Sequence, residues 1–360
     1  MPLDPKQPYN DLPLLPPNFN FDDIEILKKV NKANIALSRL SGEAKSIPNR
    51  QVLVEPLTFR EAVASSEIEN IHTTLNEAFQ TTYFTEAELK KEQKETRNYR
   101  AALNEGYKLI KEKGFLNTNS FLEIQAILEP EKPDIRKIPV QIKNTDTGEI
   151  FYTPPVGEDL LRSLLKNFED YFNDFTGDID PLIKMAVLHY QFESIHPFLD
   201  GNGRTGRILM VLHLCLAARL ELPILFISGY INQNRATYYK LLREITTSGN
   251  WKDWILFILT SVEEQSTKTM HSVTGIRELM KKYREDISNK LPKIYSAELV
   301  EYLFSFPYYS QSSMQEKLNI ASRNTASKYF SELIGIGLVK EEKYKNDKVY
   351  FCPEFHELLK

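Results

Sequence analysis

The sequence predicts a mainly α-helical protein with one β-hairpin in its core and a small C-terminal domain of the winged helix-turn-helix type. Three observations predict this class. Apolar residues recur at helical spacing over most of the first 290 residues. Two short extended runs flank a polar turn that contains Gly148. From about residue 291, the order of segments is helix, helix, helix and hairpin.

In the N-terminal part, the sequence predicts a proline-rich arm followed by helices. The first helix begins at Asp22 and Asp23 and ends at Gly42, because acidic residues favour a helix start and glycine favours a stop. The following helices are predicted over 56–80, 85–114 and 121–129. The hairpin is expected between Arg136 and Pro155. Helical spacing then returns, with helices predicted over 159–174, 180–196, 204–222, 234–249 and 251–286.

Composition excludes several classes of protein. Hydrophobic content is 42% and charged content 26%, as in ordinary globular proteins, and no apolar run has the length of a membrane span. The N-terminus lacks the pattern of a secretory signal, and the two cysteines, Cys215 and Cys352, lie far apart. We therefore expect a cytoplasmic protein without disulfides. A net charge of −4 argues against a dedicated nucleic-acid binder, and residues 293–360 hold as many basic as acidic side chains.

The segment HPFLDGNGRTGR, residues 196–207, carries the densest chemistry of the chain. Its glycines satisfy the dinucleotide-binding pattern G-x-G-x-x-G. That fingerprint must follow a strand and precede an acidic residue about 20 positions on, whereas here a helical segment precedes it and no acid follows. A P-loop is excluded too, since no G-K-[ST] follows. A glycine-rich connection with incidental charges is the remaining structural alternative.

A metal site is a second alternative. The pattern Glu-x-x-His occurs twice on predicted helices, as Glu69 with His72 and as Glu193 with His196. Two such patterns and two further glutamates build di-iron centres in helical bundles. The other predicted helices offer no inward glutamates at obvious positions, so a di-iron helical bundle is the weaker hypothesis, and a plain polar residue is the simpler interpretation of His72.

Phosphoryl or nucleotidyl transfer explains the cluster better. Glycines allow the backbone to approach an anion, and the apolar run from Ile208 predicts a helix start beside it. Asp200 is a ligand of the type that Mg²⁺ prefers. Arg204 and Arg207 offer two guanidinium groups for phosphate oxygens, and His196 suits a general base.

The same segment resembles the signature of the Fic family, H-x-F-x-[DE]-G-N-G-R-x-x-R, at every specified position. SSEIEN, residues 65–70, also matches the family's inhibitory pattern [ST]-x-x-x-E-[GN]. The resemblance covers roughly residues 10–265 and indicates the subclass with an N-terminal inhibitory helix. It implies three domains: a helical region with the inhibitory helix (1–95), a catalytic core (96–290) and the winged-helix-like domain (291–360).

The resemblance implies a protein adenylyltransferase, which moves AMP from ATP to a Ser, Thr or Tyr hydroxyl of a target protein and releases pyrophosphate. His196 would deprotonate the hydroxyl, and Asp200 would hold Mg²⁺ between the α- and β-phosphates. The backbone of residues 201–203 would cradle the phosphates, with the two arginines on the β- and γ-phosphates. The implied ATP-binding residues are Gly201, Asn202, Gly203, Arg204, Thr205, Gly206, Arg207, Tyr238 and Tyr239. The two tyrosines would line the adenine pocket, and two core tyrosines are the alternative.

Within the resemblance, Ser65, Glu69 and Asn70 form the inhibitory motif. Glu69 would pair with Arg207 and occupy the place that the γ-phosphate needs. The hairpin would hold the target by strand addition. Removal of AMP, transfer of UMP, phosphocholine or phosphate, an ATP-sensing module and a transcription regulator remain alternatives. A homo-oligomer is left open, and the balanced charge disfavours DNA as a partner.

Overall fold

The computed structural model describes residues 4–82, 86–143, 148–344 and 347–359. The N-terminal and central elements are α1 (Ile24–Ala44), α2 (Gln51–Ile68), α3 (Leu75–Gln80), η1 (Glu86–Glu88), α4 (Lys91–Lys113), α5 (Thr118–Leu128), β1 (Ile142–Lys143), β2 (Ile150–Tyr152), α6 (Glu158–Asn173), α7 (Pro181–Ile195), α8 (Asn202–Leu216), α9 (Ile227–Gln233), α10 (Arg235–Ser248) and α11 (Trp251–Lys290). The C-terminal elements are α12 (Ala297–Ser305), α13 (Gln311–Lys317), α14 (Arg323–Gly335), β3 (Lys340–Tyr344), β4 (Asp347–Phe351) and α15 (Pro353–Leu359). The mainly helical class is confirmed.

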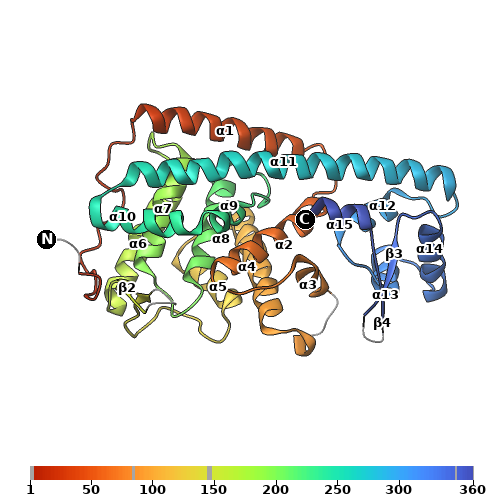
Figure 1. Ribbon diagram of the computed structural model, residues 1–360, viewed down its shortest axis with the longest axis horizontal. Coiled ribbons are helices and arrows are strands. Elements are labelled where there is room, and N and C mark those ends of the chain that lie inside the picture. Colours follow the sequence, from red (N-terminus) through yellow and green to blue (C-terminus); the bar gives the residue numbers. More distant parts are fainter. Residues whose placement is uncertain (1–3, 83–85, 144–147, 345–346, 360) are drawn as a thin grey trace.

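The long helix α11 runs beside α1 and continues to the C-terminal elements (Figure 1). Asp23 begins α1 as expected, because its carboxylate accepts hydrogen bonds from the N–H groups of Glu25 and Ile26. The helix continues past Gly42 to Ala44, so the predicted stop is wrong by two residues. Lys252 of α11 forms an ion pair with Asp23 at 2.9 Å, which joins the starts of the two helices.

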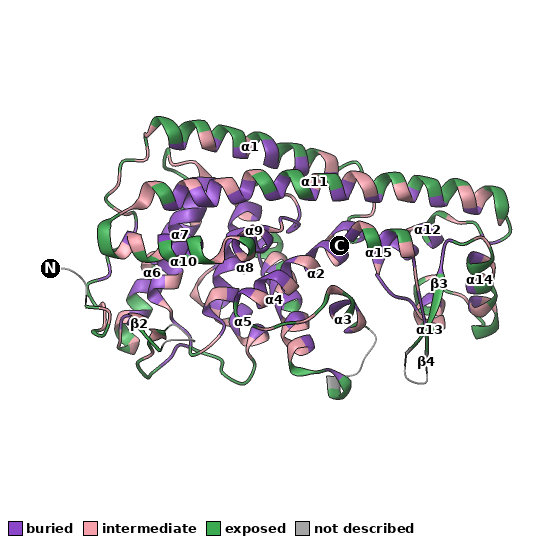
Figure 2. Ribbon diagram, viewed as in Figure 1, coloured by how far each residue is buried: buried purple, intermediate pink, exposed green. Residues whose placement is uncertain are grey.

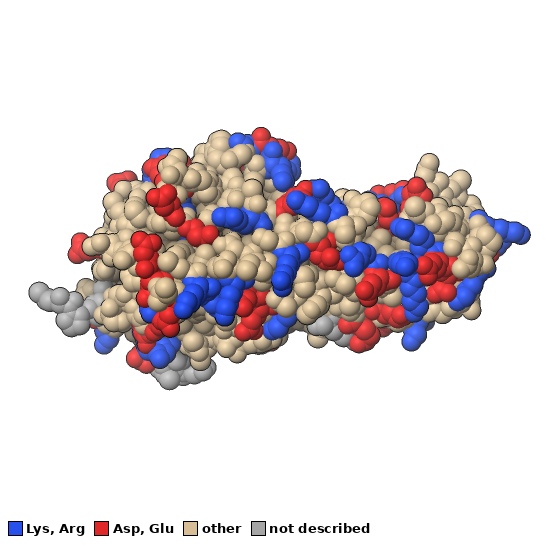
Figure 3. Space-filling model, turned by 90° about the horizontal axis from the view of Figure 1, so that it is seen from above, with Lys and Arg blue, Asp and Glu red and all other residues tan. Residues whose placement is uncertain are grey.

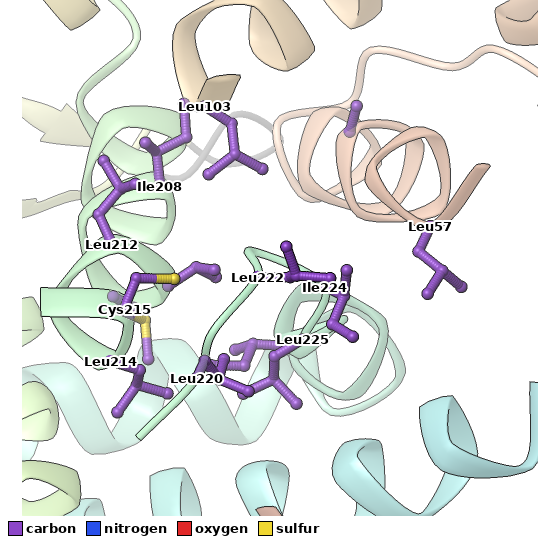
Figure 4. Packing of buried hydrophobic residues seen from close by; sticks show 14 of the residues in the cluster. Leu57, Leu103, Ile208, Leu212, Leu214, Cys215, Leu220, Leu222, Ile224 and Leu225 are labelled. Atoms are coloured by element: carbon purple, nitrogen blue, oxygen red, sulfur yellow. The ribbon is translucent and has the colours of Figure 1, made fainter. Parts of the chain in front are cut away.

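Helices α7 and α8 form the centre of the core. Nearly every side chain of both is buried (Figure 2), as expected for helices that are covered on all sides. Leu212 and Leu214 of α8 and Leu220, Leu222 and Ile224 of the following segment belong to one apolar cluster (Figure 4), and the Leu220 N–H donates to the Leu214 carbonyl at 3.1 Å. This packing fixes α8, and therefore its N-terminus, relative to the rest of the core.

The helix predicted over 56–80 is in fact two helices. It breaks after α2 because Asn70 adopts a left-handed conformation with φ of 61°. Helix α3 then starts with a capping box, in which Thr74 and Glu77 satisfy each other's backbone N–H groups. His72 therefore lies outside both helices, which corrects the predicted helical Glu-x-x-His pattern there.

The hairpin is present as β1 paired antiparallel with β2. The predicted turn includes residues 144–147, which lie outside the described residues, and Gly148, which has φ of 71°. The N-terminal arm continues along β2: the Tyr9 N–H donates to the Thr153 carbonyl at 3.0 Å, and the Thr153 hydroxyl donates to the Pro5 carbonyl at 2.6 Å. The N-terminal arm is thus hydrogen-bonded to the residue that follows β2.

The C-terminal elements follow the predicted order, with the additional helix α15. They also contact the N-terminal region: Asn49 donates to Glu301 at 2.8 Å, and the Phe79 and His356 rings lie 5.5 Å apart. The winged-helix class and the three-domain division stay predictions, and α4 runs across the expected boundary at 95/96. Charges of both signs are interspersed on the face shown in Figure 3. Within the described ranges, no helix is long and apolar enough to cross a membrane.

Candidate active site

His196 lies in the turn that ends α7. Its backbone is left-handed, with φ of 47°, an uncommon conformation for a residue with a side chain. Its N–H donates to the Phe192 carbonyl, which closes the helix. The turn is anchored below by Phe198, which is fully buried, and by a reciprocal pair of 2.9 Å hydrogen bonds between the Asn202 amide and the Phe198 backbone. The side chain of Asn202 therefore shapes this turn.

The N-terminus of α8 lies next in the chain. Gly201 precedes the helix with φ of 75°, a conformation that costs glycine little. The first N–H groups of a helix lack intrahelical partners and carry partial positive charge, so this end favours an anion. Gly203 and Gly206 lie inside α8, which begins at Asn202, two residues before the predicted start at residue 204, and ends at Leu216 instead of residue 222.

Arg207 is held by the predicted inhibitory motif. Its side chain is 1% exposed. Its Nε donates to the Ser65 hydroxyl at 2.8 Å, and its Nη2 donates to the Ser65 carbonyl and to Oε1 of Glu69, both at 2.9 Å. The structure thus joins two motifs that are more than 130 residues apart in the sequence.

Glu69 lies directly over the start of α8. It caps the C-terminus of α2, and a Cβ atom placed on Gly203 would collide with its carboxylate and lie 3.0 Å from Nη1 of Arg207. Asn70 follows in the left-handed turn and accepts a hydrogen bond from Arg235 at 2.8 Å. The absence of a side chain at Gly203 and the left-handed backbone at Asn70 together bring the Glu69 carboxylate to the anion-binding end of the helix.

The surroundings of His196 favour its neutral form. Burial, and next the Arg136 guanidinium, lower the pKa of His196 to about 4, against the opposing effects of Glu69 and Asp200. The imidazole is therefore uncharged at neutral pH and can accept a proton. A bound polyanion would raise its pKa and make it a stronger base.

Asp200 is half exposed at the edge of the site. Its Oδ2 accepts a hydrogen bond from the Lys132 ammonium at 2.7 Å, and its Oδ1 accepts one from the Gly201 N–H at 2.9 Å. Burial alone would raise the pKa of Asp200, but these two donors outweigh it and hold the pKa below its usual value. Asp200 is thus an ionised, half-exposed carboxylate. One carboxylate together with substrate phosphates suffices for Mg²⁺, which keeps several of its waters.

The described residues do not contain a cluster of side chains that could bind a metal ion without help from a substrate. Among the described residues, no group of three or more His, Cys, Asp and Glu side chains could hold a metal ion. The di-iron alternative therefore lacks a site in that part of the chain.

Arg204 is bound by carboxylates of two other helical segments. Its side chain is 3% exposed and forms ion pairs with Glu95 of α4 at 2.9 Å and with Glu129 at the end of α5 at 2.5 Å. These partners hold it in the first turn of α8. Its contacts are those of an anchor between helices, and its assignment to a phosphate stays a prediction.

The remaining predicted residues differ in accessibility. Tyr238 is 1% exposed, and its hydroxyl lies 2.8 Å from Nε2 of His189, so the core alternative describes it better. Tyr239 is 42% exposed, and burial of its hydroxyl end, followed by the Glu69 carboxylate, raises its pKa to about 12 against the opposing effect of Arg207. Thr205 is fully buried in α8, one turn below the proposed cradle.

Gly206 leaves space for a buried carboxyl group that the sequence did not single out for this role. A Cβ at this position would lie 2.6 Å from Oε1 of Glu193 and 3.2 Å from Nδ1 of His189. Burial raises the pKa of Glu193 to about 8, partly offset by Arg207. Glu193 is thus mainly protonated at neutral pH, and it lies close to the arginine that Glu69 holds.

Three family models match the chain. The Fic/DOC family N-terminal model covers residues 27–108, including the inhibitory motif, and the Fic/DOC family model covers residues 115–214, including His196 and Arg207. The chain belongs to the Fic/DOC family. The third model, the C-terminal domain of the protein adenylyltransferase SoFic-like type, covers residues 279–355.

Curated relatives are named protein adenylyltransferases. That of Drosophila willistoni is 34% identical over 111 residues, which is 31% of this chain and 21% of the relative. That of Aedes aegypti is 29% identical over 153 residues, covering 41% and 29% of the two chains. The chain thus matches about a fifth to a third of the length of these relatives.

Solved structures share the fold. A Fic family protein from Desulfovibrio desulfuricans superposes with a TM-score of 0.61 at 18% identity, over 93% of this chain and 98% of that one. Residues 134–508 of Fic-1 from Caenorhabditis elegans give a TM-score of 0.53 at 20% identity, over 71% and 73% of the two chains. The D. desulfuricans protein matches almost the whole chain, including its C-terminal region.

Proposed function

We propose that this Fic protein is an autoinhibited protein adenylyltransferase that transfers AMP from ATP to a Ser, Thr or Tyr hydroxyl of a target protein. The observation that carries the proposal is that His196, Asp200 and the N-terminus of α8 follow one another in a single turn, beside the Glu69 carboxylate that binds Arg207 and acts on His196. A base, a metal ligand and an anion-binding helix end are the components that nucleotidyl transfer needs. The names of the curated relatives support the same reaction.

In the proposed reaction, the neutral imidazole of His196 accepts the proton of the target hydroxyl. The hydroxyl oxygen attacks the α-phosphorus, the bond to the bridging oxygen breaks, and pyrophosphate leaves. The N–H groups at the start of α8 stabilise the charge that develops on the phosphoryl oxygens. Arg207 binds the γ-phosphate, and Asp200 holds Mg²⁺, which neutralises phosphate charge when bound.

Inhibition follows from the contact between Glu69 and Arg207. While Glu69 occupies the guanidinium and lies over Gly203, the γ-phosphate of ATP has neither its cation nor its space. The proposed inhibitory unit is Ser65, Glu69 and Asn70, in which Asn70 provides the turn that presents Glu69.

The remaining assignments are proposed on accessibility. Tyr239 is the better candidate for the adenine pocket, since it is partly exposed and Tyr238 is buried. The hairpin of β1 and β2 is the candidate surface for the target segment, because its short strands present an edge for strand addition. The proposed domains are the helical region with the inhibitory helix (1–95), the catalytic core (96–290) and the winged-helix-like domain (291–360).

The test is transfer of label from ATP labelled at its α-phosphate. Glu69→Gly is expected to raise labelling of a target or of the protein itself, and adding His196→Ala is expected to abolish it. Glu67→Gly is the matched control. Glu67 lies near the end of the same helix, but its carboxylate accepts a hydrogen bond from Asn232 and not from Arg207. Absence of labelled protein with Glu69→Gly would refute AMP transfer.

Removal of AMP is a second candidate, since Glu69 is a partly exposed carboxylate beside the site and could orient a water molecule. It predicts that wild-type protein releases AMP from a modified target and that Glu69→Gln does not. Competition among nucleotides in the labelling assay distinguishes ATP from UTP and from other phosphate-containing donors.

A further inference from the structure

Arg136 is a buried cation between the hairpin and the turn of His196. It is 2% exposed, and within the described ranges the acceptors of its guanidinium are backbone carbonyls. Its Nε donates to the His196 carbonyl at 2.8 Å, and its Nη2 donates to the Pro155 carbonyl at 2.5 Å and more weakly to that of Ile195 at 3.5 Å. Its Nη1 donates to the Ile138 carbonyl at 3.2 Å.

These bonds join three segments. Ile138 precedes β1, Pro155 follows β2, and Ile195 and His196 form the end of α7. The Arg136 N–H also donates to the Pro197 carbonyl at 2.9 Å, so both backbone and side chain bind the turn of His196. One residue thus connects both ends of the hairpin to the turn that carries the proposed base.

A buried guanidinium without a carboxylate partner is costly. Among the described residues, Arg136 forms no ion pair that would offset this cost. Its compensation comes from the carbonyl dipoles and from the C-terminal end of α7, where a helix favours a cation. A neutral side chain of similar length would avoid the cost, which points to a role for the charge itself.

We propose that Arg136 is a positioning residue of the active site, which locks the left-handed turn of His196 to the base of the hairpin and so fixes the direction of the imidazole. The proposal rests on the proposed function of His196 as the base. It concerns two substrates at once, because the hairpin is the candidate surface for the target and the turn borders the ATP site.

The charge of Arg136 acts on the same imidazole. The charged groups that influence His196 are Arg136, which lowers its pKa, and Glu69 and Asp200, which raise it together with the Glu193 backbone carbonyl. Burial is the largest effect and also lowers the pKa. Removing the cation leaves only groups that favour protonation besides burial, so the pKa of His196 must rise.

The test uses the full chain with Glu69→Gly as the active background. Arg136→Met is expected to lower kcat for AMP transfer about 100-fold, the size expected for a misplaced catalytic group, while the KM for ATP changes less than about threefold. The acid limb of its pH–rate profile moves to higher pH. Arg136→Lys retains the charge and loses the fork of donors, so kcat falls while the acid limb stays in place.

Arg162→Gln is the matched control, because Arg162 is an exposed arginine that pairs with Glu158 on α6. It is expected to change neither kcat nor the profile. Arg136→Met and Arg136→Lys variants with unchanged kcat and acid limb would overturn the proposal. If Arg136→Met does not fold, Arg136→Lys decides alone: wild-type kcat overturns the positioning role.

An NMR titration of the imidazole separates this proposal from the proposed function. The His196 signal, assigned with His196→Ala, is followed against pH in ATP-free protein. Arg136→Gln is expected to raise the pKa of His196 whether or not the protein transfers AMP. An unchanged pKa of His196 overturns the electrostatic role of Arg136. A raised pKa supports that role even if the protein transfers no AMP. In that case the lack of transfer refutes only the proposed activity.

Discussion

Replacing Glu69 by Gln should increase the affinity for ATP without increasing the affinity for ADP. Glu69 holds Arg207 through a charge-assisted hydrogen bond of 2.9 Å in which the arginine is 1% and the glutamate 34% exposed. A hydrogen bond to a charged group contributes about 1.5–3 kcal/mol, and the partial exposure of Glu69 reduces this to about 1–2 kcal/mol. ATP must overcome that free energy to bind Arg207, whereas ADP has no γ-phosphate to place there.

The expected gain in ATP affinity is therefore about 5- to 30-fold, from the relation of about 1.4 kcal/mol per tenfold change. The measurement is titration calorimetry of wild type and Glu69→Gln with a non-hydrolysable ATP analogue and with ADP. Glu67→Gln should leave both affinities unchanged, since its carboxylate binds Asn232. Equal gains for both nucleotides, or none for the ATP analogue, would show that Glu69 does not compete with the γ-phosphate.

Further predictions concern the core of α8, the buried Glu193 and the metal ligand. Gly206→Ala should lower the free energy of unfolding by about 1–3 kcal/mol in urea, because its Cβ would lie 2.6 Å from Glu193. The pKa of Glu193 is raised from 4.5 to about 8, so the unfolded chain releases this proton first and stability is lost as pH rises between these values. Glu193→Gln should remove that loss, so its melting temperature should rise relative to wild type between pH 5 and pH 8, and a constant difference contradicts the assignment. Lys132→Ala should strengthen Mn²⁺ binding in the presence of an ATP analogue, measured by electron paramagnetic resonance, because the ammonium occupies Asp200; Asp200→Asn should weaken it.

The contiguous part of the site was predictable from the sequence. Residues 196–207 span one turn and the start of one helix, so their order alone brings His196, Asp200 and the helix N-terminus together. The sequence also contains signals for the break between α2 and α3, although the prediction was a single helix over 56–80. Asn70 is a residue that tolerates left-handed backbone, and Thr74 with Glu77 is a capping-box pattern.

Contacts with distant segments were not predictable in the same way. Arg204 and Arg207 look equivalent in the sequence, but Glu95 and Glu129 bind the first, whereas the segment of Ser65 and Glu69 binds the second. Arg136 gave no signal, because its partners are carbonyl groups and every residue has one. Side-chain roles that depend on backbone acceptors require the three-dimensional structure.

The packing of α2 limits how the proposed inhibition can be relieved. Twelve residues of this helix are buried, and α3 beyond it contacts the C-terminal region through Phe79 and His356. Moving α2 away from Arg207 would expose several large apolar side chains, at a cost of about 1.5–3 kcal/mol each, and together these exceed the contribution of one ion pair. Glu69, in contrast, is the cap of the helix, one-third exposed, and followed by a turn. We therefore expect rotation of the Glu69 side chain, with α2 in place, to release Arg207. Hydrogen exchange of the α2 amides should then stay slow when the ATP analogue binds, and fast exchange throughout α2 would instead indicate displacement of the helix.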